Sequence, residues 1–101
     1  MKPVAPHPEA EAEFHDAVDY YEERSEGLGV RFRGEIEAAV ERIAEQPNRY
    51  PIYEATPCRQ CPVTVFPYAV YYIEEVDRIW IVALAHQRRK PGYWLRRLRD
   101  R

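Results

Sequence analysis

The sequence predicts an α+β fold in which a helical hairpin packs on one face of a small, mainly antiparallel sheet. Two stretches in the N-terminal half have apolar residues at helical spacing, whereas three β-prone apolar runs follow between residues 58 and 86. The expected order is a short strand, two helices, three strands and a short terminal helix. A length of 101 residues fits a single domain, residues 1–101.

The first helix is predicted from Glu9 onward. Residues 2–8 contain three prolines, which predicts an edge strand or an extended arm because proline is excluded from central strands. Pro8 suits a first helical turn, and Ser25-Glu26-Gly27 breaks the helix. The apolar positions recur every three or four residues, at Ala10, Phe14, Ala17, Val18 and Tyr21. Tyr20 and Tyr21 are interpreted as packing between this helix and the sheet.

A second helix is predicted from Leu28 to Glu45. Its apolar stripe comprises Leu28, Phe32, Ile36, Ala39, Val40 and Ile43. The helix should end at Gln46, because the residue before a proline disfavours the α region. Residues 49–57 contain two prolines and predict an irregular connection across the surface.

Three strands are expected next, at Cys58–Phe66, Tyr68–Glu75 and Arg78–His86, with Pro67 bending the chain between the first two. The third is almost entirely apolar, so it should be central or covered on both faces. Tyr71 and Tyr72 should point to opposite faces, one into the core and the other along a surface. Pro91–Leu98 is the candidate for the short terminal helix.

The net charge of −2 conceals an asymmetry between the two halves of the chain. Residues 1–55 carry a net charge of −7, and residues 56–101 carry +5. The bases cluster after His86, which favours a nucleic-acid, phosphate or acidic-protein partner for this half. The alternative is that the two halves pair with each other.

Neither a membrane nor a metal site is expected. No apolar run approaches the roughly 20 residues that span a bilayer, and residues 1–14 lack the apolar region of a secretory signal, so a cytoplasmic location is predicted. Cys58 and Cys61 form a C-x-x-C, but in a strand positions three apart point to opposite faces. A zinc site would need two more ligands, so we interpret both cysteines as structural and expect no cofactor.

A set of short segments, in order along the chain, resembles the RelE/ParE toxins of bacterial type II toxin–antitoxin systems. No single segment is specific, but the ordered set is, and with the helical hairpin included the resemblance extends from about Glu9 to Arg97. They are Gln46–Pro51 at the end of the helical hairpin, Arg59, Phe66–Tyr68, Val70–Tyr72, and His86–Trp94 followed by Arg96 or Arg97.

The resemblance implies the fold expected above and a cognate antitoxin that wraps the toxin, with a toxin–antitoxin hetero-oligomer as the assembly. It leaves the activity open. The ParE branch poisons DNA gyrase and is not an enzyme, whereas the RelE branch cuts mRNA inside the ribosome. A degenerate member that only binds its antitoxin is a third possibility.

The chain contains residue types that a ribonuclease uses, but it lacks part of the set. His86 is a candidate base or acid, and Tyr93 is a candidate proton donor or stacking residue. The candidate phosphate ligands are Arg59, Arg88 and Arg89. RelE-like nucleases carry lysines around the first strand of the C-terminal sheet, and this chain has lysine only at Lys2 and Lys90. The acidic isoelectric point, about 5.9, also argues against a target made mostly of RNA. The ParE-like interpretation is therefore favoured.

The residues expected to contact the target or the antitoxin belong to the basic segment and the strand beside it. They are Arg59, His86, Arg88, Arg89, Tyr93, Trp94 and Arg97. Structural alternatives exist: His86 bonded to a backbone carbonyl, Arg59 paired with an acid of the helical hairpin, and Tyr93 and Trp94 closing the core. An amphipathic antitoxin segment is expected on the sheet face that the helices leave bare and in the groove along the hairpin.

Overall fold

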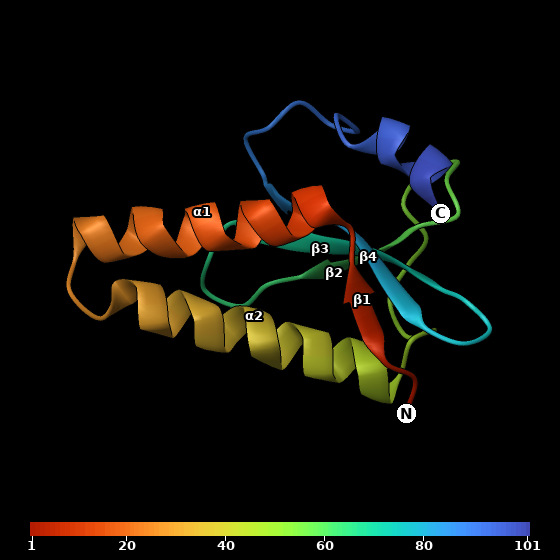
Figure 1. The fold of residues 1–101 in the computed structure, drawn as a ribbon, viewed down its shortest axis with the longest axis horizontal. Coiled ribbons are helices and arrows are strands. Elements are labelled where there is room, and N and C mark those ends of the chain that lie inside the picture. Colours follow the sequence, from red (N-terminus) through yellow and green to blue (C-terminus); the bar gives the residue numbers. More distant parts are fainter.

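The computed structural model describes residues 1–101 as two helices packed on a four-stranded sheet, which confirms the predicted α+β architecture. The strands are β1 (Val4–Pro6), β2 (Arg59–Pro62), β3 (Tyr68–Glu74) and β4 (Ile79–His86), in the spatial order β1-β4-β3-β2. Only β1 runs parallel to its neighbour. Figure 1 shows the helices forming one layer in front of the sheet.

The helical hairpin has the predicted bounds. Helix α1 (Pro8–Arg24) begins at the expected proline, and α2 (Leu28–Glu45) ends just before Gln46-Pro47. Gly27 joins them with a φ of 86°, a left-handed conformation that glycine adopts without steric cost. The tight connection brings the apolar stripes of both helices onto the same face of the sheet. Neither helix is long and apolar enough to cross a membrane.

Strand β4 lies between β1 and β3, as its apolar composition predicts. Its partner β1 is the expected edge strand but reaches only from Ile79 to Ile81. A bulge interrupts the β3–β4 register, in which Tyr71 is opposite Ala83 and Tyr72 is opposite Ile81, so Val82 has no partner on β3. On the β1 side, the backbone groups of β4 beyond Ile81 have no neighbouring strand to bond to.

Both faces of the sheet are buried, and this corrects the expectation of one bare face. Tyr72 lies among the residues that the helices cover, whereas Tyr71 belongs to a second core on the opposite face. Both tyrosines are buried, so neither lines a surface. The second face is covered by Tyr53 of the connection and by Trp94 and Leu98 of the C-terminal segment, residues 87–101. Figure 1 shows this segment passing over the sheet beside α1.

Strand β2 and the terminal helix depart most from their predicted bounds, whereas β3 and β4 differ by one residue each. Strand β2 ends at Pro62 rather than Phe66, because Val65 turns the chain with a φ of 74°. The predicted helix Pro91–Leu98 is instead a turn followed by a 3₁₀ helix, η1 (Leu95–Asp100). Trp94, just before η1, and Arg97 within it are buried and held by tertiary contacts, which outweigh the weak helical propensity of so short a segment.

Candidate functional site

The candidate site is built on the basic loop, residues 87–93, which follows the end of β4. The Nδ1 atom of His86 accepts a hydrogen bond from the backbone N–H of Arg88 (3.0 Å), which starts the turn. The partner is a backbone N–H, whereas the structural alternative for His86 was a bond to a carbonyl. The observed bond assigns the proton of the neutral imidazole to Nε2, which has no protein partner. His86 therefore presents a free donor at the base of the loop.

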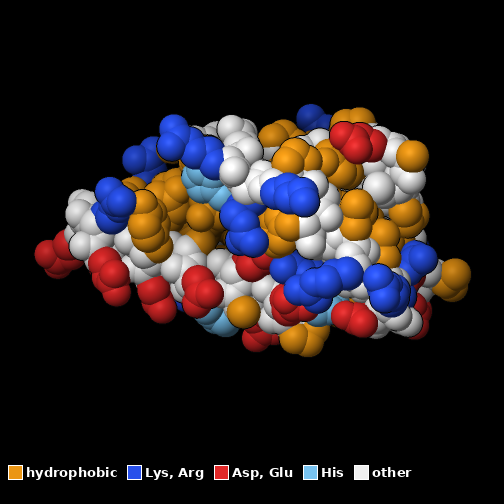
Figure 2. All heavy atoms as spheres, turned by 90° about the horizontal axis from the view of Figure 1, so that it is seen from above, with side chains coloured by type: hydrophobic (Ala, Val, Ile, Leu, Met, Phe, Trp, Pro, Cys, Tyr) orange, Lys and Arg blue, Asp and Glu red, His pale blue; other side chains and the backbone are white.

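Arg89 lies flat on Tyr93, with the guanidinium carbon 3.9 Å from the ring centroid. Stacking of this kind holds a cation in place while leaving its N–H groups exposed. Arg88 and Lys90 are exposed and flank this pair. Figure 2 views the molecule from the side of the C-terminal segment and shows Lys and Arg side chains gathered there.

The loop is fastened to α1 by Glu13, a residue that no motif in the sequence singles out. The Glu13 carboxylate accepts hydrogen bonds from the Tyr93 hydroxyl, from both terminal nitrogens of Arg97 (2.9 Å each) and from the backbone N–H of Leu84 (3.1 Å). Burial and the bond donated to Glu13 raise the pKa of Tyr93. Tyr93 is thus held as a neutral donor.

Arg97 is the second member of this cluster, and it is buried. Only 3% of the residue is exposed, and its Nη1 also donates to the carbonyl of Val82 (3.1 Å), the bulged residue of β4. Burial alone would lower the pKa of Arg97, but the Glu13 carboxylate more than offsets this and the pKa is raised. In this conformation Arg97 cannot present its side chain to a partner, so we remove it from the contact set.

Trp94 is also internal, with 1% of its surface exposed. Its ring packs against those of Tyr53 (5.7 Å between centroids) and Tyr71 (4.5 Å), which also contact each other (5.0 Å), on the second face of the sheet. The alternative that Trp94 closes the core is confirmed, and it too leaves the contact set.

Arg59 lies away from the basic loop. It is opposite Tyr72 on β3, whereas His86 is opposite Tyr68, and these two positions are four residues apart. At the usual rise and strand spacing this corresponds to about 13 Å along the sheet and about 10 Å across it. The Arg59 guanidinium donates to the carbonyl of Tyr50 (2.7 Å), so the structural alternative, an ion pair with an acid of the helical hairpin, is not formed.

A charged cleft of about 320 Å³ separates the basic loop from α1. The sequence pointed to three of its lining residues, His86, Arg89 and Tyr93, and missed the others, which come from α1, β3 and β4. Tyr20 is 49% exposed at its mouth, so it does not pack on the sheet as expected, unlike Tyr21. The lining comprises Glu13, Asp16, Ala17, Tyr20, Tyr68, Leu84, His86, Arg89 and Tyr93.

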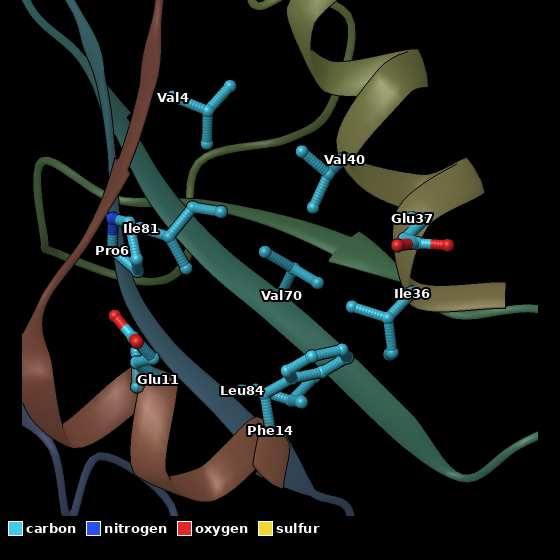
Figure 3. Close-up of a pocket in the computed structure, with 11 residues that line it drawn as sticks. Val4, Pro6, Glu11, Phe14, Ile36, Glu37, Val40, Val70, Ile81 and Leu84 are labelled. Carbon is cyan, nitrogen blue, oxygen red and sulfur yellow. The ribbon is translucent and has the colours of Figure 1, made fainter. Parts of the chain in front are cut away.

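A second concavity, the apolar groove, lies between the two helices and β1. It has a volume of about 300 Å³, and eight of its eleven lining residues are hydrophobic. Figure 3 shows Val40, Ile36 and Phe14 of the helices facing Val4 and Ile81 of the sheet across it. Glu11 and Glu37 also line it. The groove along the hairpin, expected from the sequence, is thus present as an open apolar surface.

The two cysteines are unpaired and fully buried. Cys61 lies in the helix-side core and Cys58 in the core of the opposite face, as their spacing predicts. Burial raises the pKa of both thiols, which lowers their reactivity. Neither belongs to a group of acids, cysteines and histidines that could hold a metal ion.

Comparison with known proteins supports the resemblance seen in the sequence. The chain is similar in fold to a solved structure described as a chromosomal ParDE TA system from P. aeruginosa, with a TM-score of 0.73, 16% identity, and coverage of 85% of this chain and 96% of that one. None of the curated proteins matches it in sequence. The sequence model described as the ParE toxin of the type II toxin–antitoxin system parDE matches residues 4–91. The chain therefore belongs to the ParE toxin family of type II toxin–antitoxin systems.

Proposed function

We propose that this toxin acts by binding and poisoning DNA gyrase and that a cognate antitoxin neutralises it. The observation that carries the proposal is the arrangement of the basic loop. Arg88, Arg89 and Lys90 are exposed around the free Nε2 of His86, on a rigid base fixed by Glu13. Such a surface suits recognition of another macromolecule, and the family of the chain makes gyrase the expected one.

The alternative of a ribosome-dependent mRNA endoribonuclease fits the geometry less well. General acid–base cleavage requires the base, the acid and the phosphate ligands within hydrogen-bond reach of one reacting group. Arg59 lies at the other end of the sheet from His86 and is occupied by the Tyr50 carbonyl. The Tyr93 hydroxyl is occupied by Glu13, and its raised pKa makes it a weak acid.

The apolar groove supports the antitoxin part of the proposal. A groove between two helices and a sheet edge suits the apolar face of an amphipathic segment. Because Glu11 and Glu37 line it, the segment should carry basic residues beside its apolar ones. The groove and the basic loop lie on different sides of α1, so one toxin has room for both partners in a hetero-oligomer.

Purified toxin tests the proposal in two parallel assays. We expect inhibition of gyrase supercoiling, relieved by adding the antitoxin, and no cleavage of mRNA on translating ribosomes. Ribosome-dependent cleavage that is lost in His86→Ala, with supercoiling unaffected, would establish the ribonuclease alternative. If expression in several hosts causes no growth arrest, the chain is a member that only binds its antitoxin.

A further inference from the structure

The charged cleft has two walls of opposite charge. The C-terminal side carries His86 and Arg89, and the α1 side carries Asp16. Figure 2 shows the same division, with His, Lys and Arg side chains on one side of a hollow, hydrophobic side chains inside it, and a row of Asp and Glu along the helix. A basic loop alone does not require an acidic wall so close to it, so the acidic wall needs its own explanation.

The basic wall offers two donors for an anionic group. The N–H of His86 points away from the turn because Nδ1 is already bonded to the Arg88 backbone. Arg89 is held over Tyr93, and its guanidinium has no carboxylate partner within the chain. Both groups can therefore bind a partner without first breaking a hydrogen bond or ion pair within the chain.

On the acidic wall, Asp16 is the carboxylate that has no partner within the chain. Glu13 is already bonded to Arg97, Tyr93 and Leu84, so its charge is compensated. Asp16 lies one turn further along α1, is exposed, and forms no ion pair within the chain. Asp16 is thus available for a cation of a partner.

The floor of the cleft is apolar and aromatic. Tyr68 packs edge-on against His86 with their centroids 5.0 Å apart, and Leu84 lies beside it. Tyr20 stands half-exposed at the opening, with the guanidinium carbon of Arg24 4.6 Å from its ring centroid. Exposed tyrosine with arginine is typical of the residues that dominate protein interfaces.

We propose that the charged cleft is the subsite that receives a protein segment of the toxin's target. The segment presents an apolar or aromatic residue to the floor, a carboxylate to His86 and Arg89, and a lysine or arginine to Asp16. A nucleic-acid strand fits less well, because its phosphates would pass the acidic row of α1. The inference rests on the proposed function, since it describes how the target is recognised.

Two charge reversals test the proposal, each with a matched control on the same element. We expect Asp16→Arg and Arg89→Asp each to weaken binding to purified gyrase by about tenfold or more, because each places like charges in contact. Asp19→Arg, on the same helix but outside the lining, and Arg99→Asp, on the C-terminal segment, should change it by less than about threefold. All four variants should retain antitoxin affinity, which also verifies folding.

The sign of the Asp16→Arg effect separates a protein occupant from a nucleic acid. Binding of a single-stranded oligothymidylate, measured by fluorescence anisotropy, would strengthen in Asp16→Arg and weaken in Arg89→Asp if the occupant were a polyanion. Such a result, accompanied by unchanged gyrase binding, would overturn the proposal. Loss of antitoxin affinity in both cleft variants, with Asp19→Arg unaffected, would assign the cleft to the antitoxin and also overturn it.

Growth arrest separates failure of the cleft from failure of the gyrase proposal. If the unmodified toxin arrests growth without binding gyrase, the proposed target is wrong. Loss of arrest in both cleft variants would then still support the cleft as the target subsite. Arrest that persists in both variants would overturn the cleft whichever protein is the target.

Discussion

At the scale of single residues, Glu13 is where the contacts between α1 and the C-terminal segment converge. Its side chain is 17% exposed and its partner Arg97 only 4%. Arg97 depends on this carboxylate, because a buried guanidinium without a counter-charge is far less stable than a paired one. The pair also orients Tyr93, on which Arg89 rests.

We expect Glu13→Ala to lower the free energy of unfolding by about 3 kcal/mol, because it leaves Arg97 buried and unpaired. Urea denaturation measures the change. The double variant Glu13→Leu/Arg97→Met also removes the unpaired charge and should recover part of the loss, since the Leu84 N–H and the Val82 carbonyl remain without these partners. A double variant that is less stable than Glu13→Ala would show that Arg97 does not depend on Glu13.

Buried tyrosines predict a loss of stability in alkali. Burial raises the pKa of both Tyr68 and Tyr72 to about 12, whereas tyrosine in the unfolded chain titrates near 10. The folded state holds these protons more tightly, so stability is complete below pH 10 and falls as the pH rises toward 12. The expected slope is at most about 1.4 kcal/mol per pH unit for each tyrosine.

Denaturation at a series of pH values between about 9 and 12 tests this expectation. Tyr72→Phe should flatten the dependence, although it also removes the bond from the Tyr72 hydroxyl to the Pro47 carbonyl (2.6 Å) and so lowers stability at neutral pH. An equal slope for the unmodified protein and Tyr72→Phe would contradict the assignment.

At the scale of elements, the end of β2 is decided by a backbone conformation that the sequence does not favour. Val65 is a β-branched residue with a φ of 74°, and it is 64% exposed. Positive φ is unfavourable for such a side chain, so the observed turn must be held by its surroundings. Phe66 supplies the holding contact, since it packs against Tyr21 and Phe32.

Replacing Val65 with glycine should therefore stabilise the protein by about 1 kcal/mol, because relief of the strain exceeds the added entropy of the unfolded chain. Thermal denaturation should show a rise in Tm of about 4 °C. Val76→Gly provides the control, since Val76 is 95% exposed and has no positive φ. The stability of Val76→Gly should be unchanged or slightly lower. An equal rise in the Tm of both variants would show that strain at Val65 is not the cause.

The elements also mark where prediction from sequence succeeds. Helical spacing and proline positions predicted α1 and α2 because local chemistry decides both ends of each helix. The β2 strand was predicted too long, since Val63-Thr64-Val65 has high strand propensity but tertiary contacts of Phe66 turn the chain. Propensity alone cannot anticipate such an override.

At the scale of the whole molecule, the two concavities lie on different sides of α1 and should be separable by mutation. Val40→Glu places a charge in the apolar groove and should weaken antitoxin binding about tenfold or more, since it buries an unpaired carboxylate in the complex. The toxin should still arrest growth, now without rescue by the antitoxin. Val30→Glu, at a position 70% exposed on the same helix, should be rescued normally. Full rescue of Val40→Glu would place the antitoxin elsewhere.

The candidate site could be predicted only in part, because some of its residues come together only in the folded chain. The basic loop is contiguous in sequence, so His86, Arg88 and Arg89 could be found together. Glu13 and Asp16 approach the loop only through the fold, and in sequence they look like any solvated helix face. Trp94 and Arg97 are residue types that often make contacts with partners, but both are buried, Trp94 in the second core and Arg97 against Glu13. Tertiary placement, not residue type, decides these roles.

The Glu13–Arg97 pair also has a consequence for how the protein behaves at high concentration. Strand β1 covers only the first three residues of β4, and an uncovered strand edge is a template on which another chain can add a strand. Glu13 takes the Leu84 N–H and Arg97 takes the Val82 carbonyl, so two charged side chains fill the positions of the missing strand. This ion pair thereby blocks the addition of another chain at the edge of β4, the most hydrophobic strand of the molecule.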